Sequence, residues 1–452
     1  MPAGVMLAQG YEQAYVAAYA LRRGELAGGP ALARVRDAAI ERFAALGFPT
    51  THDEEWKYTN LTPFLKVVYE PAPSGALVDW PSSATASPVL AFVNGRFAPE
   101  LSSALPVAGL KLSSLKDAIE QGRLLDHIAR YAAFETNAMA ALNTAMFEDG
   151  ALVEIADGAV IDAPIELLFM TAANGRPVAC YPRNLILAGR DSQARIIETY
   201  RAIPSFHDRS EAGGEASGPP PVPYFTNAVT ELVAAEGAII EHYRVQEEGL
   251  AALHFGMLAA HQGANSHFTS HNIALGGALA RNEIAAVLDG EGSECALNGL
   301  YVTAGAQHVD NHTTLDHARP HCSSRELYKG ILDGRSQGVF HGRIIVRPEA
   351  QKTDAIQRNK NLLLSRDAVI NTKPQLEIYA DDVRCTHGAT VGQVDEEAVF
   401  YLCSRGIPLE EARSLLTYAF TADLLDAIQV EPLRVRLRAA LLARLSGKGD
   451  RK

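Results

Sequence analysis

Cysteine is scarce in this sequence, and so are the short motifs that bind cofactors. Five cysteines occur in 452 residues, at Cys180, Cys295, Cys322, Cys385 and Cys403, and none forms a CxxC pair. Because an iron–sulfur cluster usually takes about four thiolate ligands, we do not expect this chain to hold one without ligands from a second chain. There is no GxxxxGK[ST] loop and no GxGxxG after a predicted strand, so any ATP would have to be bound by a partner.

Long apolar runs and an excess of positive charge are also missing. No uninterrupted apolar segment approaches the roughly 18 residues of a membrane span. Lys and Arg total 41 against 53 Asp and Glu, and the net charge of -12 opposes binding to nucleic acid or anionic lipid. The first residues lack the basic region of a signal peptide, and an odd number of scattered cysteines suits a reducing compartment. We therefore expect a cytoplasmic protein with neither a membrane nor a nucleic acid as partner.

Helical periodicity marks the beginning of the chain. Apolar residues recur at helical spacing in two segments between Tyr11 and Gly47, and Gly47 is placed to end the second helix. A Pro- and Ser-rich linker then leads into a short strand, VLAFVNGRF, and a further helix is predicted from Leu115 to Phe147. Residues 1–150 are therefore expected to form an N-terminal, mainly helical domain.

Short β-rich segments fill residues 151–392. Gly237, Gly263 and Gly290 fall 26 and 27 residues apart in turns between these segments. A sandwich, a barrel and a β-solenoid are all compatible with so many strands, and the approximate repeat favours the solenoid. Residues 204–222, rich in Gly and Pro, are expected to form a disordered surface insert.

Helical periodicity returns over residues 393–452. Pro408 lies near the start of one predicted helix, and PLRVRLRAALLARLSG forms another with an apolar face and an Arg-rich face. Such a unit can cover the open end of a solenoid, or it can serve as a docking module for another protein. Both interpretations remain open on pattern alone.

Histidines are concentrated in HVDNHTTLDHARPHC, which contains His308, His312, His317 and His321. Imidazoles bind metals, but ligands on one strand must share a face, and the spacing between His312 and His317 breaks that parity. The alternative is that these side chains form polar ladders or interface hydrogen bonds. The same choice applies to HFTSH, whose two histidines share a face on a single strand.

Cys385 and His387 form a second candidate site. Residues i and i+2 point to the same side of a strand, so this imidazole can depress the thiol pKa and create a nucleophile or a metal ligand. A structural role is equally compatible with so small a motif. Asp381 and Asp382 precede it, and either turn capping or transient iron binding suits them.

A long contiguous match identifies a family that the sequence resembles. The match is densest from LYKGILDGRSQGVFHGRIIVRPEAQKTDAIQRNKNLLLS through PQLEIYADDVRCTHGATVGQVDEEAVFYLCSRGIPLEEARSLLTYAF, and it extends more weakly to GFPTTHDEEWKYTNL. These segments resemble the SufB/SufD family of iron–sulfur cluster assembly proteins. The resemblance implies a right-handed parallel β-helix core with helical domains at both ends. It also implies a non-catalytic scaffold subunit in an ATP-driven complex for cluster assembly and iron acquisition.

The SufD branch is favoured because Gly388 follows His387, whereas the matching His of SufB is followed by a carboxylate. For that branch, the resemblance implies pairing with SufB through the β-helices, with His387, and more weakly Cys385, facing a transient cluster shared with SufB. His387 is then a candidate metal ligand. The resemblance also implies that the C-terminal domain docks the ATPase SufC, which binds the ATP. We expect the SufC-binding residues to be Phe400, Tyr401, Arg405, Leu415, Leu416 and Phe420. A flavin is associated with the assembled family complex, but no flavin motif occurs in this sequence.

Two other functions are compatible with the residues alone. A β-helix can be a polysaccharide lyase or hydrolase, which gathers acidic or basic groups in a cleft for general acid–base catalysis. The histidine-rich segment instead suggests a stand-alone metal carrier.

Overall fold

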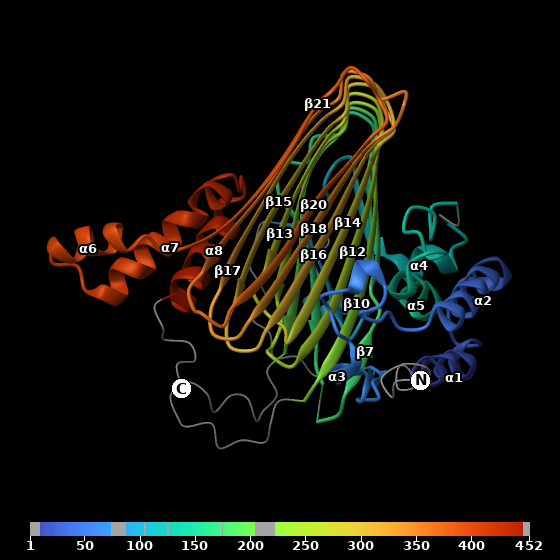
Figure 1. The fold of residues 1–452 in the computed structure, drawn as a ribbon. Helices are drawn as coiled ribbons and strands as arrows, with labels where there is room; N and C mark the ends of the chain where they lie inside the picture. The colour runs from blue at the N-terminus through green and yellow to red at the C-terminus, as the bar shows by residue number, and fades with distance from the viewer. Residues whose placement is uncertain are drawn as a thin grey trace.

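Two long parallel sheets face each other and form a β-helix, with helices packed on both outer sides (Figure 1). The structure is a computed structural model, and it describes residues 10–73, 87–103, 105–123, 126–173, 175–203 and 222–445. The predicted insert at 204–222 lies almost entirely outside the described residues. The fold class expected from the sequence, mainly β with helical ends, is confirmed.

Successive strands alternate between the two sheets, so the chain coils from one rung to the next. The first sheet contains β4 (Leu110–Ser114), β5 (Ala151–Ile155), β8 (Arg183–Ala188), β10 (Tyr224–Ala234), β12 (Ala252–Gln262), β14 (Leu279–Leu288), β16 (His308–His317), β18 (Gln337–Val346) and β20 (Val369–Ile378), joined at its side by β1 (Glu70–Pro71) and β7 (Val178–Cys180). The second contains β2 (Val89–Val93), β3 (Arg96–Phe97), β6 (Ile165–Thr171), β9 (Gln193–Ala202), β11 (Ile239–Glu247), β13 (His267–Ala274), β15 (Glu294–Thr303), β17 (Ser323–Leu332), β19 (Asp354–Leu363) and β21 (Arg384–Gln393).

Close stacking of the rungs explains the glycine spacing seen in the sequence. A side chain at Gly263 would meet the backbone of Glu236 in the preceding turn, and one at Gly290 would meet Ala264. Glycine is therefore required where consecutive turns lie directly on one another. The interior holds a continuous apolar cluster that includes Ile240 and Leu297.

Helices cover the outer face of the first sheet. These are α1 (Glu12–Arg22), α2 (Gly29–Leu46), α3 (Thr62–Leu65), α4 (Leu115–Glu120) and α5 (Ala138–Met146), together with the short turn η1 (Glu54–Trp56). A second short turn, η2 (Pro99–Leu101), lies beside β2 of the second sheet. Phe43 of α2 is fully buried and belongs to one cluster with Phe225, Phe255 and Leu279, which project outward from the sheet. These strands therefore carry apolar side chains on their outer face as well as in the interior.

The sequence predicted one helix from Leu115 to Phe147, and this prediction is wrong. Only α4 and α5 are helical in that stretch, and the described residues between them form turns. The two helices at Tyr11–Gly47 are confirmed as α1 and α2. Gly47 ends α2 with a φ of 67°, and its N–H donates to the carbonyl of Phe43.

The C-terminal helices are α6 (Glu396–Ser404), α7 (Leu409–Asp426) and α8 (Glu431–Leu445). Leu425 and Leu437 are fully buried against Tyr243 and Ile273 on the outer face of the second sheet. These helices therefore pack on the side of the β-helix and do not cover its open end, which was one of the two roles considered from the sequence.

Candidate functional site

The β-helix ends in a rung that nothing in the described part of the chain covers. Strand β20 pairs only with β18, and β21 pairs only with β19. Neither strand contains a buried residue, although every earlier strand from β10 to β19 does. Each of the two thus presents a row of unpaired backbone groups along ten residues, which is a template for another strand.

The backbone differs between these two free edges. The N–H of Val369 donates to Ser336 and that of Tyr379 donates to Val346, so the intervening even-numbered positions of β20 face away from β18. Pro374 occupies one of them and supplies no donor, which blunts the centre of this edge. No proline interrupts β21. The free edge of β21 is therefore the better surface for strand addition.

His387 lies on β21 and is exposed. Cys385, two residues earlier on the same face, packs against the interior cluster, so both side chains face the inside of the open end. Burial raises the pKa of the Cys385 thiol, and Asp354 raises it further. The predicted thiol–imidazole pair therefore shares a face, but the thiol is held in its protonated, weakly nucleophilic form.

A column of inward-facing polar residues lies behind His387. Its register partner on β19 is Gln357, whose own partner on β17 is Glu326. The Gln357 amide donates to the Glu326 carboxylate over 2.7 Å, and both side chains are buried. Burial raises the pKa of Glu326 to about 7, although the hydrogen bond from Gln357 opposes this. A titratable group thus lies two rungs from the exposed imidazole.

The two aspartates before Cys385 belong to a turn. Asp382 pairs with Lys352, and its N–H donates to the Gln351 side chain over 2.9 Å. Both aspartates are exposed. These contacts support turn capping by Asp382, which was one of the two roles considered from the sequence.

The four clustered histidines do not form one site. His308 and His312 project from the outer face of β16, where they meet the N-terminal segment at Thr59 and Glu55. His317 points inward and contacts Ser324 over 2.9 Å, as the parity argument required. His321 lies beyond β16 in a turn with a φ of 60°. Of HFTSH, His267 lies 3.3 Å from Glu294, while His271 is buried and stacks on Tyr243.

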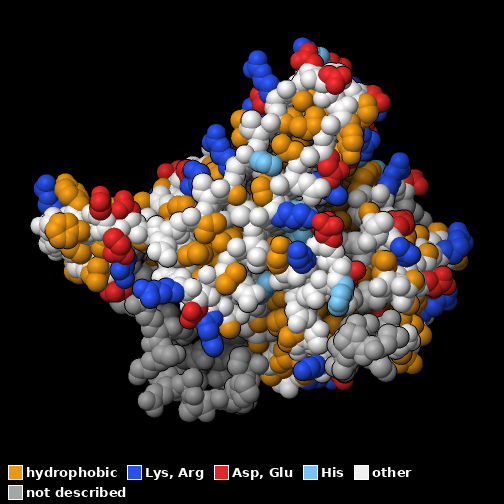
Figure 2. Space-filling model, in the orientation of Figure 1, with side chains coloured by type: hydrophobic (Ala, Val, Ile, Leu, Met, Phe, Trp, Pro, Cys, Tyr) orange, Lys and Arg blue, Asp and Glu red, His pale blue; other side chains and the backbone are white. Residues whose placement is uncertain are grey.

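Helix α6 extends away from the body of the molecule (Figure 1), and apolar side chains lie on this arm (Figure 2). Phe400 and Tyr401 are 74% and 57% exposed, and the Arg405 guanidinium lies 5.1 Å from the Tyr401 ring. Leu415 on α7 is 42% exposed. Exposed aromatic and Arg side chains on a projecting helix are typical of protein interaction sites.

Leu416 and Phe420, the other two residues predicted to bind a partner, are less exposed to solvent. Leu416 is half-buried. Phe420 packs against the α7–α8 cluster, and its ring and carbonyl both contact the Lys329 ammonium, the carbonyl at 2.7 Å. Phe420 therefore anchors α7 to the β-helix.

Three of the other cysteines are enclosed by the β-helix and its helices. All five cysteines are free, and Cys180, Cys295 and Cys322 are buried. Burial raises the pKa of Cys180 to about 12 and that of Cys295 even further. Neither Cys180 nor Cys295 is a thiolate at neutral pH. This agrees with the inference from the sequence that the chain has too few thiolate ligands to hold a cluster alone.

Comparison with known proteins gives the family. Residues 169–420 match the model of the SUF system FeS cluster assembly, SufBD core domain, and residues 9–167 match the SufBD protein N-terminal region. The chain belongs to the SufBD family. The matches span both the helical N-terminal part and the β-helix, and the SufBD core match extends into α7.

Three curated proteins match along most of their length. The chain is 34% identical to an iron–sulfur cluster assembly SufBD family protein of Synechocystis over 424 residues, 91% of each chain. It is 32% identical to the iron–sulfur cluster assembly protein SufD of Escherichia coli, over 90% of this chain and 92% of that protein. It is 27% identical to the chloroplastic protein ABCI7 of Arabidopsis thaliana, over 90% and 85%. Membership of the SufBD family favours a role in iron–sulfur cluster assembly over the polysaccharide lyase or hydrolase considered from the sequence.

Sequence reasoning missed one group of residues. Glu55, His312 and His341 come together where η1 lies on the β-helix, although they are far apart in the chain. The only sequence signal is the rung repeat, which places His341 beside His312.

No helix among the described residues combines the length and apolarity needed to traverse a bilayer.

Proposed function

We propose that this protein is the SufD-type scaffold subunit of a cytosolic complex that assembles iron–sulfur clusters. In this proposal it pairs with SufB, docks the ATPase SufC and catalyses no reaction itself. The cluster is cargo, held transiently between the SufB and SufD chains, and ATP is bound by SufC. The observation that carries the proposal is the uncovered terminal rung, which bears His387 beside an unpaired strand edge.

The geometry of the rung supports a shared site. Strand addition to β21 would satisfy its free N–H groups and place the partner's backbone next to the His387 side chain. A neutral imidazole ligates iron, and its ordinary pKa near 6.5 also suits proton transfer. Cys385 is the weaker candidate ligand because burial keeps its thiol protonated.

The docking of SufC is proposed for α6 and the beginning of α7. Phe400, Tyr401, Arg405 and Leu415 are exposed there, whereas Leu416 and Phe420 support the surface from behind. This division refines the six residues expected from the sequence. The domain boundaries expected there, 1–150, 151–392 and 393–452, are retained as part of the proposal.

The test compares His387→Ala with Cys385→Ala in the complete complex. We expect His387→Ala to assemble normally, because the side chain is exposed, but to reduce anaerobic cluster formation at least tenfold. Cys385→Ala should have a milder effect. The measurements are the absorption of the nascent cluster and the mass of the complex. Cluster formation at the normal rate in His387→Ala, or loss of activity only through dissociation, would refute the ligand role.

A further inference from the structure

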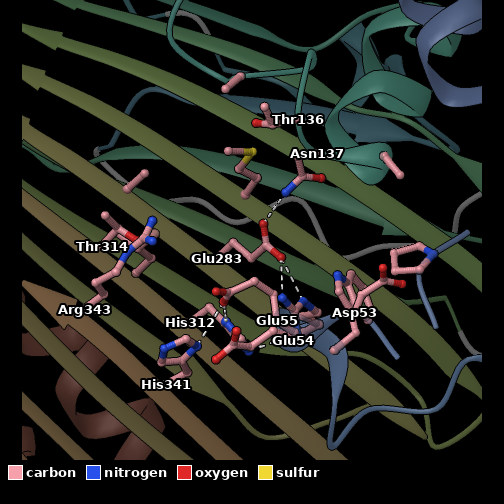
Figure 3. Close-up of a pocket in the computed structure, with 18 of the residues that line it drawn as sticks. Asp53, Glu54, Glu55, Thr136, Asn137, Glu283, His312, Thr314, His341 and Arg343 are labelled. Carbon is pink, nitrogen blue, oxygen red and sulfur yellow. Dashed lines mark hydrogen bonds and ion pairs between the residues drawn. The ribbon is translucent and has the colours of Figure 1, made fainter. Parts of the chain in front are cut away.

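The N-terminal segment crosses the outer face of β14, β16 and β18 at η1 (Figure 3). The Trp56 ring lies 3.8 Å from the Arg281 guanidinium, and the Thr59 hydroxyl donates to Asp310 over 2.5 Å. Arg281 and Asp310 are buried beneath this segment. A fixed backbone therefore presents the Glu55 carboxylate to the sheet.

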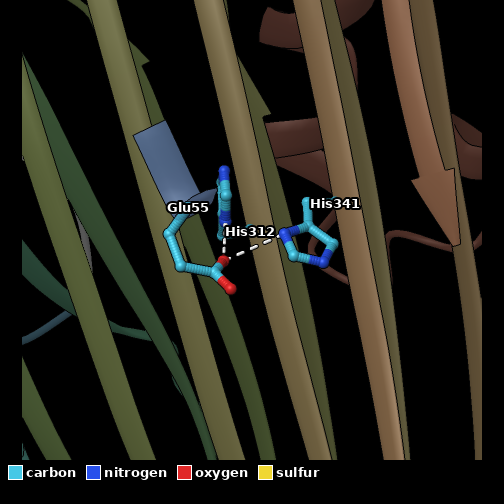
Figure 4. A group of neighbouring side chains, drawn as sticks. All are labelled: Glu55, His312 and His341. Atoms are coloured by element: carbon cyan, nitrogen blue, oxygen red, sulfur yellow. Dashed lines mark hydrogen bonds and ion pairs between the residues drawn. The ribbon is translucent and has the colours of Figure 1, made fainter. Parts of the chain in front are cut away.

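Two imidazoles converge on that carboxylate (Figure 4). His312 and His341 are register partners on adjacent strands and point outward together. The Nδ1 atoms of His312 and His341 lie 3.2 Å and 2.9 Å from one Glu55 oxygen, Oε2. The three potential ligand atoms all fall within 4.8 Å of one another.

A hydrogen-bond acceptor lies on the far side of each ring. His312 Nε2 lies 2.9 Å from the Asp310 carboxylate, and His341 Nε2 lies 3.3 Å from the Gln375 side-chain oxygen. The Asp310 and Gln375 oxygens are acceptors, so a tautomer of each ring with its proton on Nε2 leaves the Nδ1 lone pair available to a metal ion beside Glu55. Metal-binding histidines are usually oriented in this way by an acceptor on the second nitrogen.

The net charge around this cluster is negative, which favours the binding of a divalent cation. Arg281 lies 3.0 Å from His312 Nε2, but its charge is matched by Glu283 at 2.7 Å and by Asp310. With neutral histidines, the carboxylates of Glu55, Asp310 and Glu283 exceed the one buried cation by two charges. The nearby Glu54 is paired with Lys373.

An opening leads from solvent to this cluster. A pocket of about 540 Å³ is lined by Glu55, His312 and His341 together with Arg343 and Thr314 (Figure 3). Glu55 is itself 52% exposed at its side chain. A metal ion can therefore enter and keep water or another small ligand on its open positions.

We propose that Glu55, His312 and His341 bind a divalent first-row transition metal such as Zn²⁺ or Fe²⁺. Two imidazoles and one carboxylate form a donor set that these ions prefer, and it leaves at least one coordination position open. The bound ion ties the N-terminal segment to the β-helix. This site lies on the outer face of the first sheet, whereas His387 lies on β21 of the second sheet, and the inference does not rest on the proposed assembly function.

The test is a Co²⁺ titration of the full chain after removal of metals with a chelator. We expect one equivalent to bind, detected by visible absorption and by equilibrium dialysis, and we expect the metal to raise the melting temperature. His312→Ala and His341→Ala should each weaken binding at least tenfold. Glu55→Gln should also weaken it, while circular dichroism confirms that this nearly isosteric variant is folded.

Two control variants separate this site from other metal-binding positions. His261→Ala alters a histidine on β12 whose Nε2 lies 3.3 Å from Asp289, a pair with no third ligand, and it should bind as the wild type does. His267→Ala, at a histidine on β13 that lies 3.3 Å from Glu294, should bind normally too. The proposal is overturned if the wild type binds no stoichiometric Co²⁺, which would leave two histidines that only hydrogen-bond to Glu55. Unchanged binding in Glu55→Gln and in both His312→Ala and His341→Ala, or loss of binding in His267→Ala instead, would overturn it as well.

Discussion

Glu326 has an acidic side chain in the interior of the β-helix, where ionisation is costly. The residue is 3% exposed, and its carboxylate accepts a hydrogen bond from Gln357. Burial raises its pKa from 4.5 to about 7. The folded state therefore binds this proton more tightly than the unfolded state, and the stability from the protonated form is fully present below pH 4.5. It is lost as the pH rises towards 7 and beyond.

We predict that Glu326→Gln removes this pH dependence. At about 1.4 kcal/mol for each unit of pKa shift, the variant should be more stable than the wild type by about 3 kcal/mol at pH 8. At pH 4.5 the difference should be small. Urea unfolding at both values measures the two free energies. Glu291→Gln, at an exposed turn, is the control, and a similar pH dependence in Glu326→Gln and the wild type would show that Glu326 is already ionised in the fold.

Single residues differ in how far the sequence predicted them. The shared face of Cys385 and His387 followed from their spacing on one strand, and so did the opposite orientations of His312 and His317. The contact between Glu55 and His341 was not predictable, because it depends on where the N-terminal segment crosses the sheet. The exposure of the last rung likewise depends on where the C-terminal helices pack, and the local sequence pattern does not show this.

At the scale of single elements, β21 combines a free edge with an uninterrupted backbone. The N–H of Arg384 donates to Thr353, so the N–H groups of alternate residues such as Ala389 point away from β19. Ala389 is exposed. A proline there removes one outward donor without breaking the ladder to β19.

We therefore predict that Ala389→Pro leaves the chain folded but weakens pairing with SufB at least tenfold. Sedimentation or surface-based binding measures the affinity, and circular dichroism monitors the fold. Ala389→Val is the matched control, because valine keeps the N–H and suits a strand. Undiminished pairing of Ala389→Pro would assign the contact to a surface other than this edge.

Helix α6 gives a prediction about the second partner. Replacing Phe400 with Asp and Tyr401 with Ser should alter the free energy of unfolding by less than about 0.5 kcal/mol, since both side chains are exposed. It should reduce capture of SufC by at least tenfold in a co-purification assay. Val435→Asp on α8, at a position 54% exposed, is the control. Equal loss in both variants would point to a general charge effect.

The sequence predicted some helices correctly and one of them wrongly. The two helices at Tyr11–Gly47 and those after residue 392 have an apolar stripe and clear end signals, and both groups were expected. The segment between α4 and α5 contains enough Ala and Leu to suggest helix, but its backbone N–H groups are used differently. Those of Ala129, Tyr131 and Ala132 donate to the Glu231 carboxylate on the sheet. Tertiary contacts override helical propensity there.

At the scale of the whole molecule, the β-helix separates two helical layers that do not share a core. The N-terminal helices bury Phe43 against the first sheet, and the C-terminal helices bury Leu437 against the second. The interior cluster lies between them. Damage to one layer should therefore leave the other intact, because stability in such a fold is distributed over locally cooperative units.

We predict that Leu437→Ala loosens only the C-terminal layer. Leu437 is fully buried, and truncation of a buried leucine costs about 2–5 kcal/mol through lost apolar contact and the cavity that remains. Hydrogen exchange measured by mass spectrometry should rise over Leu409–Asp426 and Glu431–Leu445 but stay unchanged over Gly29–Leu46. The mirror variant Phe43→Ala should show the reverse pattern. If exchange rose in both layers for either variant, the two layers would be coupled through the β-helix, and a signal could pass between the C-terminal helices and the N-terminal segment.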